Sequence, residues 1–356
     1  MTMAAADNRR EIPLEQRASR DLFPLSLNQR DMWFQGQIHA QEGLNNVCVQ
    51  VTLEGALNVE FFRRAWQAVV DRHETLRTVF VQVEGLPWQK VLPVAPVHFE
   101  IMDLSDQPDA GRDEVLQSIE RQLARRAFDF ATGPLFRFTL VRESESRHSL
   151  FFVFSHLILD GIYMAQIFEQ VGASYAAQVH GGDPALPPLG IQYTDFAARQ
   201  HDLLQQGLLQ DHEEYWREQL QLPLPAMELP TDRVSHKVAS FELGVLDLDI
   251  PDAVYQRLKG FRKRYRTTMF RVVLVAFEVL LQQVVGEKEL LLGVPFTTLP
   301  AHWPQLLGFF GHMVPVRASL EETSRFSDVL GAANLQLQEA QRHVESPLFE
   351  AVRGLR

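Results

Sequence analysis

One stretch of the chain, positions 151–165 with the sequence FFVFSHLILDGIYMA, constrains the fold more than any other. Residues 150–154 form a continuous apolar run, which is the pattern of a strand buried on both faces. His156 follows where this strand should end, and residues 162–179 have the apolar spacing of a helix. The sequence therefore predicts a strand, a short loop and a helix that together hold a histidine at a site largely shielded from water.

Spacing alone leaves two interpretations of His156 open. An imidazole has an unperturbed pKa of about 6.5, so at neutral pH it is mostly the free base and can accept a proton from an attacking amine or alcohol. In the second interpretation, His156 is a core histidine with satisfied hydrogen bonds, and Asp160 is only the N-cap of the next helix. A further argument is needed to choose between them.

Composition and charge exclude several classes of protein. The formal net charge of −11 argues against a nucleic-acid binder, which needs a basic face. The single cysteine, Cys48, excludes an internal disulfide and a cysteine-based zinc site and fits a reducing cytoplasm. No segment resembles a signal peptide, and the most apolar one, residues 270–285, is interrupted by charged and polar side chains. We therefore expect a soluble, cytoplasmic protein without a bound metal.

The order of predicted elements is that of an α/β chain of the two-layer α+β kind. Before residue 180 we expect strands at 47–53, 76–83, 88–92, 97–102, 135–141 and 149–154, with helices at 59–73, 113–127 and 162–179. After residue 190 we expect helices at 211–220, 252–264, 268–285 and 326–344, with strands at 244–250, 290–295 and 313–320. Residues 181–190 contain three prolines and three glycines and therefore predict a linker. The expected organisation is a polar N-terminal segment 1–21, an N-terminal lobe 22–180, the linker, and a C-terminal lobe 191–356.

Seven motifs along the chain are similar to motifs of one protein family. Residues 155–161, SHLILDG, resemble the HHxxxDG signature of nonribosomal peptide synthetase condensation domains and of the wider chloramphenicol acetyltransferase-like superfamily. The others stand in the family's order: 25–33 (LSLNQRDMW), 72–80 (RHETLRTVF), 193–197 (YTDFA), 215–216 with 229–233 (YW and LPTDR), 307–317 (LGFFGHMVPVR) and 345–350 (ESPLFE). The resemblance thus runs from about residue 22 to the end of the chain.

This resemblance implies a fold and a reaction. Condensation domains consist of two chloramphenicol acetyltransferase-like lobes arranged as a V-shaped pseudo-dimer, with the histidine loop at the cleft between them. They form an amide, less often an ester, between a donor acyl or peptidyl thioester and an acceptor nucleophile, both carried on 4′-phosphopantetheine arms of carrier proteins. By resemblance, this chain binds no cofactor directly, and its partners are donor and acceptor carrier proteins and neighbouring synthetase domains.

The functional residues of the family transfer to this chain position by position. His156 corresponds to the second motif histidine, which the resemblance makes the base or the group that positions the nucleophile. Asp160 and Gly161 match the remaining fixed positions of the HHxxxDG motif. Arg77 matches an arginine that the family pairs with the motif aspartate, so the resemblance implies that Asp160, Gly161 and Arg77 support the loop.

Three further residues are candidates for lining the cleft: Ser155, Tyr163 and His312. Ser155 replaces the first histidine of the signature, and His312 stands where the family usually has asparagine. The change at Ser155 keeps a non-catalytic recruitment domain open as an alternative. A second alternative is a superfamily acyltransferase that uses acyl-CoA or a single carrier, and epimerisation domains share the same signature.

The C-terminus also departs from the family. The chain stops at Arg356, just after the 345–350 motif, whereas the family continues to an RDxSRNPL-like motif and further strands. We therefore expect an incomplete second lobe, with an open sheet edge and exposed apolar surface near residues 290–295 or 313–320.

Overall fold

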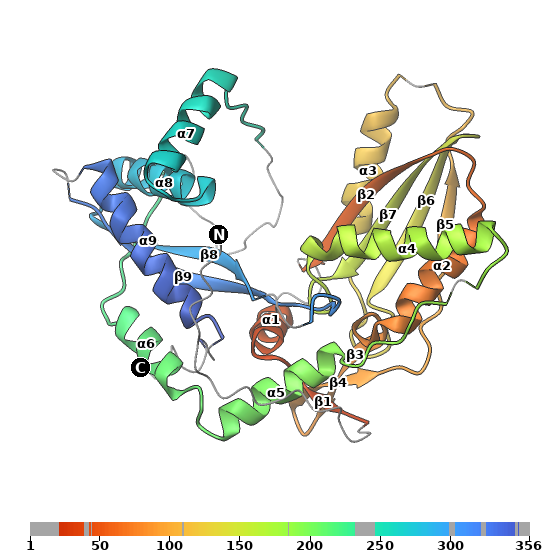
Figure 1. The fold of residues 1–356 in the computed structure, drawn as a ribbon, viewed down its shortest axis with the longest axis horizontal. Helices are drawn as coiled ribbons and strands as arrows, with labels where there is room; N and C mark the ends of the chain where they lie inside the picture. Colours follow the sequence, from red (N-terminus) through yellow and green to blue (C-terminus); the bar gives the residue numbers. More distant parts are fainter. Residues whose placement is uncertain are drawn as a thin grey trace. The chain divides into compact units, whose positions relative to one another are not determined.

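The computed structural model describes residues 21–38, 43, 45–108, 110–183, 185–231, 246–298, 303–321, 325–345 and 348. By its contacts the chain divides into two compact units, which are described separately (Figure 1). The first comprises residues 1–206 and 299–309, and the second comprises residues 207–298 and 310–356. The expected linker 181–190 lies inside the first unit, and the expected N-terminal segment 1–21 falls outside the described residues except for Asp21.

A four-stranded sheet with the order β2-β7-β6-β5 is the centre of the first unit. Strand β7 (Arg147–Ser155) lies between β2 (Asn46–Glu54) and β6 (Phe136–Ser144) and is antiparallel to both, while β5 (Phe99–Asp103) joins parallel to β6. Every residue of β7 after Arg147 is buried. The prediction of a strand covered on both faces is therefore confirmed.

Helices cover the two faces of this sheet (Figure 1). From α2 (Val59–Arg72), the fully buried Trp66 packs against Phe152, with ring centroids 5.0 Å apart. On the opposite face, α3 (Arg112–Arg125) contributes Leu116 and Ile119 to a cluster with Phe151. Because neighbouring strand residues point to opposite faces, Phe151 and Phe152 anchor the two helical layers.

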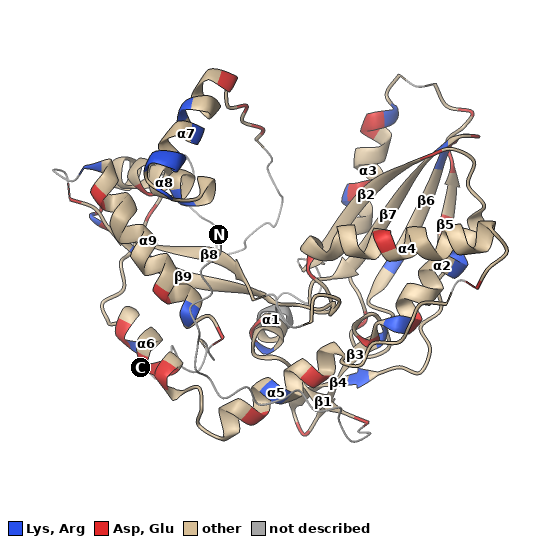
Figure 2. Cartoon of the chain, in the orientation of Figure 1, with Lys and Arg blue, Asp and Glu red and all other residues tan. Residues whose placement is uncertain are grey.

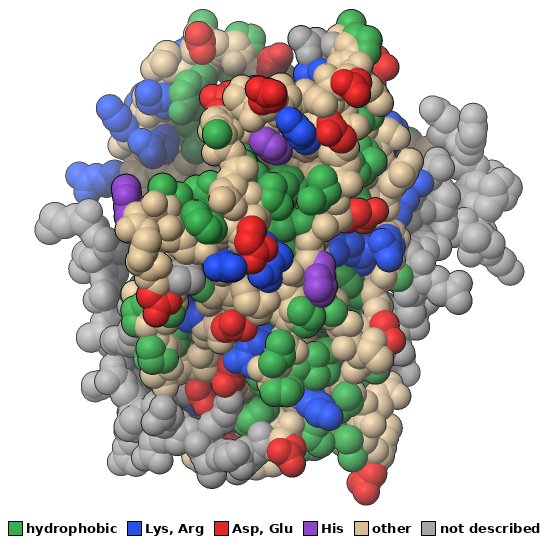
Figure 3. Space-filling model, turned by 90° about the vertical axis from the view of Figure 1, so that its right-hand side faces the viewer, with side chains coloured by type: hydrophobic (Ala, Val, Ile, Leu, Met, Phe, Trp, Pro, Cys, Tyr) green, Lys and Arg blue, Asp and Glu red, His purple; other side chains and the backbone are tan. Residues whose placement is uncertain are grey.

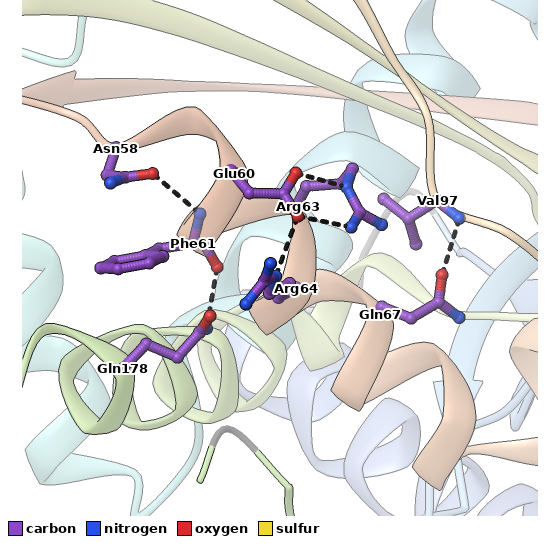
Figure 4. Close-up of polar contacts among 8 residues, drawn as sticks. All are labelled: Asn58, Glu60, Phe61, Arg63, Arg64, Gln67, Val97 and Gln178. Carbon is purple, nitrogen blue, oxygen red and sulfur yellow. Dashed lines mark hydrogen bonds and ion pairs between the residues drawn. The ribbon is translucent and has the colours of Figure 1, made fainter. Parts of the chain in front are cut away.

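Local hydrogen bonds fix where α2 begins and what it packs against (Figure 4). Asn58 is the N-cap, and its side chain accepts from the Phe61 amide at 3.0 Å. Gln178, near the end of α4 (Met164–Val179), donates to the Phe61 carbonyl at 2.9 Å. Further along the helix, Gln67 accepts from the Val97 amide at 2.9 Å. These contacts hold α2 in register with α4 and with the chain leading into β5.

The first unit also contains elements that the periodicity did not predict. These are β1 (Phe23–Pro24), α1 (Leu27–Ile38) and α5 (Tyr193–Gln205), together with the 3-10 turns η1 (Glu74–Arg77) and η2 (Gly161–Tyr163). Strand β1 pairs with β4 (Leu86–Val91), which pairs with β3 (Thr78–Val83), in a separate three-stranded sheet. The residues of α5 were expected to belong to the C-terminal lobe 191–356, but by their contacts they belong to the first unit.

The second unit is built around an antiparallel pair of strands, β8 (Glu289–Thr297) and β9 (Gly311–Ser319). Its helices are α6 (Gln210–Gln219), α7 (Asp252–Arg264), α8 (Met269–Val285) and α9 (Phe326–Arg342). Val294, Val316 and Leu337 join the strands to α9 in one buried cluster. In the part of the chain that the structure describes, no single helix has the length and apolarity of a membrane span; α7 and α8 pass that test only as a pair bent by 107°.

The predicted strand 244–250 is wrong. Residues 246–250 have no regular structure, and residues 244–245 lie outside the described part of the chain. The alternation Leu-Asp-Leu-Asp-Ile suits a strand, but Leu246 and Leu248 are 91% and 84% exposed, so no partner strand or core surface covers them among the described residues. Met313 of β9 is also 64% exposed, whereas Leu290 and Val314 are buried, and the expected incompleteness of the second lobe stays a prediction.

Candidate active site

His156 lies in the turn directly after β7, which is an interior strand of the first unit's four-stranded sheet. Its amide donates to the Asn45 carbonyl at 2.7 Å, which ties the turn to the chain entering β2. Its Nδ1 is buried, although the side chain as a whole is 34% exposed. The accessible part of the ring is therefore on the side away from Nδ1, where Nε2 lies.

Asp160 faces the buried edge of this imidazole. The distance from His156 Nδ1 to Asp160 Oδ1 is 3.4 Å, and the carboxylate side chain is 6% exposed. Nδ1 makes no hydrogen bond at this distance, but the negative charge beside it favours the tautomer with its proton on Nδ1, which leaves the Nε2 lone pair free to accept a proton. The ring can then serve as a proton acceptor from its accessible side.

Four hydrogen bonds from separate segments hold the loop that carries His156 and Asp160. Two are donated by loop amides, from His156 N to Asn45 O (2.7 Å) and from Asp160 N to Gly308 O (3.0 Å). Two are accepted by loop carbonyls, from Gln29 Nε2 of α1 to Leu157 O (2.8 Å) and from Thr75 Oγ1 of η1 to Ile158 O (2.5 Å). Gln29 and Thr75 are themselves buried. Since each loop carbonyl or amide meets a partner on a different element, the loop has little freedom to shift.

Phe309 places an aromatic ring beside the histidine. The Phe309 and His156 ring centroids are 5.0 Å apart, with the rings at 68° to each other. The Phe309 carbonyl accepts from Asn28 Nδ2 at 2.9 Å and from the Tyr193 hydroxyl at 2.5 Å. Tyr193 also lies 2.8 Å from Ser26 Oγ, and burial raises the pKa of its phenol, so it remains a neutral donor.

Ser155 and Tyr163, two of the expected cleft-lining residues, are both buried. Ser155 ends β7 with no exposed surface, and its Oγ accepts from the Leu157 amide at 3.4 Å. Tyr163 is 4% exposed at the start of α4, where burial and the charge of Asp160 raise the pKa of its hydroxyl. The position of the first motif histidine therefore points into the fold in this chain, away from solvent.

The expected ion pair between Arg77 and Asp160 is not formed. Arg77 instead donates to three backbone carbonyls, those of Val70 (3.2 Å), Asp71 (3.3 Å) and Leu92 (2.5 Å). Two of these carbonyls are at the C-terminal end of α2, where carbonyls have no partner within the helix. Arg77 thus caps α2 and secures the end of β4. The contact between η1 and the histidine loop is made by Thr75, and support of the loop by Arg77 stays a prediction.

Two further expected site residues are Gly161, at the start of η2, and His312, in β9. A Cβ on Gly161 would meet no described atom within 4 Å, so no neighbour among the described residues requires a glycine there. His312 belongs to β9 in the second unit, where its Nε2 lies 3.2 Å from Thr298 Oγ1 and burial lowers its pKa to about 4. At neutral pH His312 is therefore an uncharged hydrogen-bonding group, and its place in the cleft stays a prediction.

A hollow of about 500 Å³ in the first unit has neither His156 nor Asp160 in its lining, although Arg77 contributes to it. Arginines from α2 and η1 line it together with residues 185–192. Their guanidinium groups already have partners: Glu60 holds both Arg63 and Arg64 (Figure 4), and Arg72 donates to two glutamines. The hollow contains none of the loop residues, and we do not assign the reaction to it.

Sequence reasoning missed four residues that build the site: Gln29, Thr75, Gly308 and Phe309. All four lie within motifs that carry the family resemblance, at 25–33, 72–80 and 307–317. The motifs could therefore have pointed to them, although no spacing shows that they converge on one loop. The described residues contain no group of three or more His, Cys, Asp and Glu side chains that could hold a metal ion.

Comparisons with known proteins agree with the motifs. A family model described as "Condensation domain" matches residues 19–356. The chain is 29% identical over 331 residues to a linear gramicidin synthase of Brevibacillus parabrevis, an alignment that covers 93% of this chain and 4% of that protein. It is 31% identical over 333 residues to phosphinothricin tripeptide synthetase PhsB of Streptomyces viridochromogenes, covering 93% of this chain and 28% of that one.

A solved structure shares the fold. The X-domain from teicoplanin biosynthesis superposes with a TM-score of 0.85 at 24% identity, over 96% of this chain and 75% of that one. At this identity the likeness concerns the fold alone. The mixed helix and strand architecture expected from the sequence is therefore confirmed.

Proposed function

This chain belongs to the condensation domain family, and from that premise we propose that it forms an amide bond, less often an ester, between two carrier-bound substrates. One carrier protein presents a donor acyl or peptidyl thioester and the other presents the acceptor nucleophile, each on a phosphopantetheine arm. The observation that supports this best is the geometry of His156: Nδ1 faces a buried carboxylate, and the other edge of the ring is accessible. The chain spans only 4% and 28% of the two synthetases named above, and these large proteins are the context in which carriers would meet it.

His156 has a defined role in this reaction. The acceptor amine attacks the thioester carbonyl, a C–N bond forms, and the C–S bond breaks with release of the donor thiol. His156 Nε2 takes the proton that the nitrogen loses, or holds the amine in its free-base form, and the proton then passes to the leaving thiolate. A positioned base contributes typically 10²–10⁴-fold, and holding both substrates in attack geometry contributes about 7–11 kcal/mol.

A covalent route through Ser155 is disfavoured. This serine precedes the histidine in sequence, but its side chain has no exposed surface, and its Oγ accepts from the Leu157 amide. A nucleophilic serine must reach the substrate and have a base within hydrogen-bonding distance. The reaction we propose is therefore a direct transfer between the two carriers.

The same observation bears on the recruitment alternative. Ser155 replaces the first histidine of the signature. This replacement would favour a non-catalytic recruitment domain if the side chain at position 155 contacted substrate. The position is instead fully buried at the end of β7. The departure thus removes no accessible group, and the accessible imidazole of His156 is kept.

The test is intact mass spectrometry of a loaded donor carrier and a loaded acceptor carrier, before and after addition of the protein. We expect His156→Ala to lower the rate of product formation by roughly 10²–10⁴-fold with an unchanged unfolding curve, because only a partly exposed loop side chain is lost. His180→Ala, at an exposed position just after α4, is the matched control and should act like the wild type. Wild-type turnover by His156→Ala, under conditions limited by the chemical step, would refute the catalytic role.

A further inference from the structure

The phenol of Tyr193 belongs to a buried network of uncharged groups. Charged residues are spread over the helices of both units (Figure 2), and on the face drawn in Figure 3 acidic and basic side chains are interspersed. Ser26, Asn28 and Tyr193, by contrast, are all buried, and the Tyr193 hydroxyl lies 2.8 Å from Ser26 Oγ. Burial raises the pKa of the Tyr193 phenol, so the network stays uncharged at neutral pH.

Tyr193 contacts the 308–309 segment in two ways. Its hydroxyl donates to the Phe309 carbonyl at 2.5 Å, and Asn28 Nδ2 donates to the same oxygen at 2.9 Å. Its ring lies against Gly308, where a Cβ would come within 1.9 Å of Tyr193 Cδ2. The Gly308 carbonyl in turn accepts from the Asp160 amide at 3.0 Å. The peptide groups on both sides of the Phe309 Cα are therefore held by hydrogen bonds, and because each peptide group is planar, these bonds fix the backbone there.

The backbone position of the 308–309 segment determines what surrounds the imidazole. The Phe309 ring is buried, and its centroid is 5.0 Å from that of the His156 ring. The Gly308 carbonyl holds the backbone of Asp160, whose Oδ1 lies 3.4 Å from His156 Nδ1. Through this segment, Tyr193 thus bears on both the aromatic neighbour of the imidazole and the carboxylate beside its Nδ1.

The start of α5 is held by the same turn that holds the histidine loop. Gln192 and Thr194, the neighbours of Tyr193, both bond to Glu74 of η1: Gln192 accepts from the Glu74 amide at 3.1 Å, and Thr194 donates to the Glu74 carboxylate at 3.1 Å. Thr75, the next residue of η1, donates to a carbonyl of the histidine loop. Helix α5 and the loop therefore share one support, and the phenol connects that support to the 308–309 segment.

The Tyr193 hydroxyl contributes little to stability by itself. Folding exchanges its bonds to water for bonds within the protein, so the net gain from a typical hydrogen bond is small. Each group that it contacts would keep another partner without it: the Phe309 carbonyl would keep Asn28 Nδ2, and Ser26 Oγ would keep Asn28 Oδ1 at 3.2 Å. A phenylalanine at position 193 would therefore preserve the fold but leave the Phe309 carbonyl with one of its two donors.

We propose that Tyr193 is a positioning residue for the pair His156 and Asp160, and that it acts through the 308–309 segment. This inference rests on the proposed function, in which the accessible edge of His156 meets the attacking nucleophile. A base works only within hydrogen-bonding reach of the proton that it accepts. A small displacement of the imidazole or of the carboxylate should therefore slow the chemical step without weakening the binding of the carriers. Tyr193 itself is buried and takes no part in proton transfer.

The test compares Tyr193→Phe with Tyr175→Phe in the mass spectrometric assay with two loaded carriers. Tyr175 is the matched control, because its hydroxyl also makes a hydrogen bond, from the Asn58 amide at 3.0 Å, but in the C-terminal half of α4. We expect Tyr193→Phe to lower kcat about 10-fold with KM for each carrier within about twofold of the wild type, and Tyr175→Phe to act like the wild type. Circular dichroism checks that each variant is folded. Asn28→Ala, which removes the other donor to the Phe309 carbonyl, is a second variant and should lower kcat in the same way.

A double variant separates positioning from general damage to the fold. If Tyr193 acts through His156, adding Tyr193→Phe to His156→Ala should not lower the rate further, because the group that it positions is already absent. A further loss of about 10-fold in the double variant would mean that the hydroxyl serves the fold at large, and it would overturn the proposal.

The His156 ring also provides a measurement that needs no turnover. In NMR spectra of protein with isotope-labelled histidine, the ring nitrogen shifts report which nitrogen carries the proton, and His156→Ala identifies the signals of this residue. We expect Tyr193→Phe to lower the share of the tautomer with its proton on Nδ1, because Asp160 is held less firmly, and Tyr175→Phe to leave it unchanged. A changed share in a protein without turnover would support the positioning role and refute the proposed function. Unchanged signals and an unchanged kcat in Tyr193→Phe, in a protein whose turnover depends on His156, would overturn the positioning role alone.

Discussion

Replacing Gly308 with alanine adds one methyl group and should strongly destabilise the first unit. The new Cβ would lie 1.9 Å from Tyr193 Cδ2 and 2.4 Å from Cε2, where ordinary contacts are at 3.4–4 Å. Tyr193 cannot move aside easily, because it is 1% exposed and its hydroxyl is held by the Phe309 carbonyl and Ser26. Overpacking of this kind costs about 1–3 kcal/mol, and each hydrogen bond lost adds about 0.5–1.5 kcal/mol. Because both hydrogen bonds of the Tyr193 hydroxyl would be disturbed, we expect the free energy of unfolding to fall by about 4 kcal/mol.

The measurement is urea unfolding followed by circular dichroism, with the free energy extrapolated to water. Gly172→Ala is the matched control: it lies in α4 of the same unit, and its Cβ would meet no atom within 4 Å. A glycine inside a helix costs about 0.5–1 kcal/mol relative to alanine, so this control should be slightly more stable than the wild type. If Gly308→Ala unfolds at the same urea concentration as the wild type, the close approach of Tyr193 to the 308–309 segment is refuted.

Three further predictions test the buried groups. Ser155→His should leave turnover of the folded protein nearly unchanged, because position 155 has no exposed surface; a large gain or loss in the mass spectrometric assay would contradict this. Gln29→Ala leaves the Leu157 carbonyl without its 2.8 Å donor and should lower the free energy of unfolding by about 1–3 kcal/mol in urea titrations, whereas an unchanged value would mean that the loop is held without it. Burial raises the pKa of Glu278 from 4.5 to about 7, so the folded state loses stability relative to the unfolded state as pH rises through that window. Glu278→Gln should therefore gain up to about 3 kcal/mol over the wild type between pH 4.5 and pH 7, and a pH-independent difference would argue against the shift.

Strong local patterns predicted the elements that position the site. The apolar run 150–154 corresponds to β7, and the helix expected at 59–73 corresponds to α2. Helix α5 escaped prediction because its buried positions include Thr194 and Asp195, which periodicity counts as solvent-facing. A strand was wrongly predicted at 244–250 because alternation describes a strand's faces but cannot supply the neighbour that it must pair with.

The site itself was predictable only in part. Motif order gave His156 and Asp160, whose side chains do lie 3.4 Å apart. The prediction that Arg77 pairs with Asp160 was wrong. The direction of a long side chain depends on which acceptors lie nearby after folding, and Arg77 donates to three backbone carbonyls instead. Phe309 was not connected to His156, since the contact joins residues that are distant in sequence and no local pattern encodes it.

The contact between Phe309 and His156 has a consequence for how the protein is made. The ribosome synthesises the sheet, the histidine loop and α4 well before residues 306–309 emerge. Until then the nascent chain has the motif, but the imidazole has no aromatic neighbour and the Asp160 amide lacks its bond to Gly308. The contacts of Phe309 and Gly308 with the histidine loop can therefore form only late in translation, and a chain that ends before residue 306 would contain His156 and Asp160 without them.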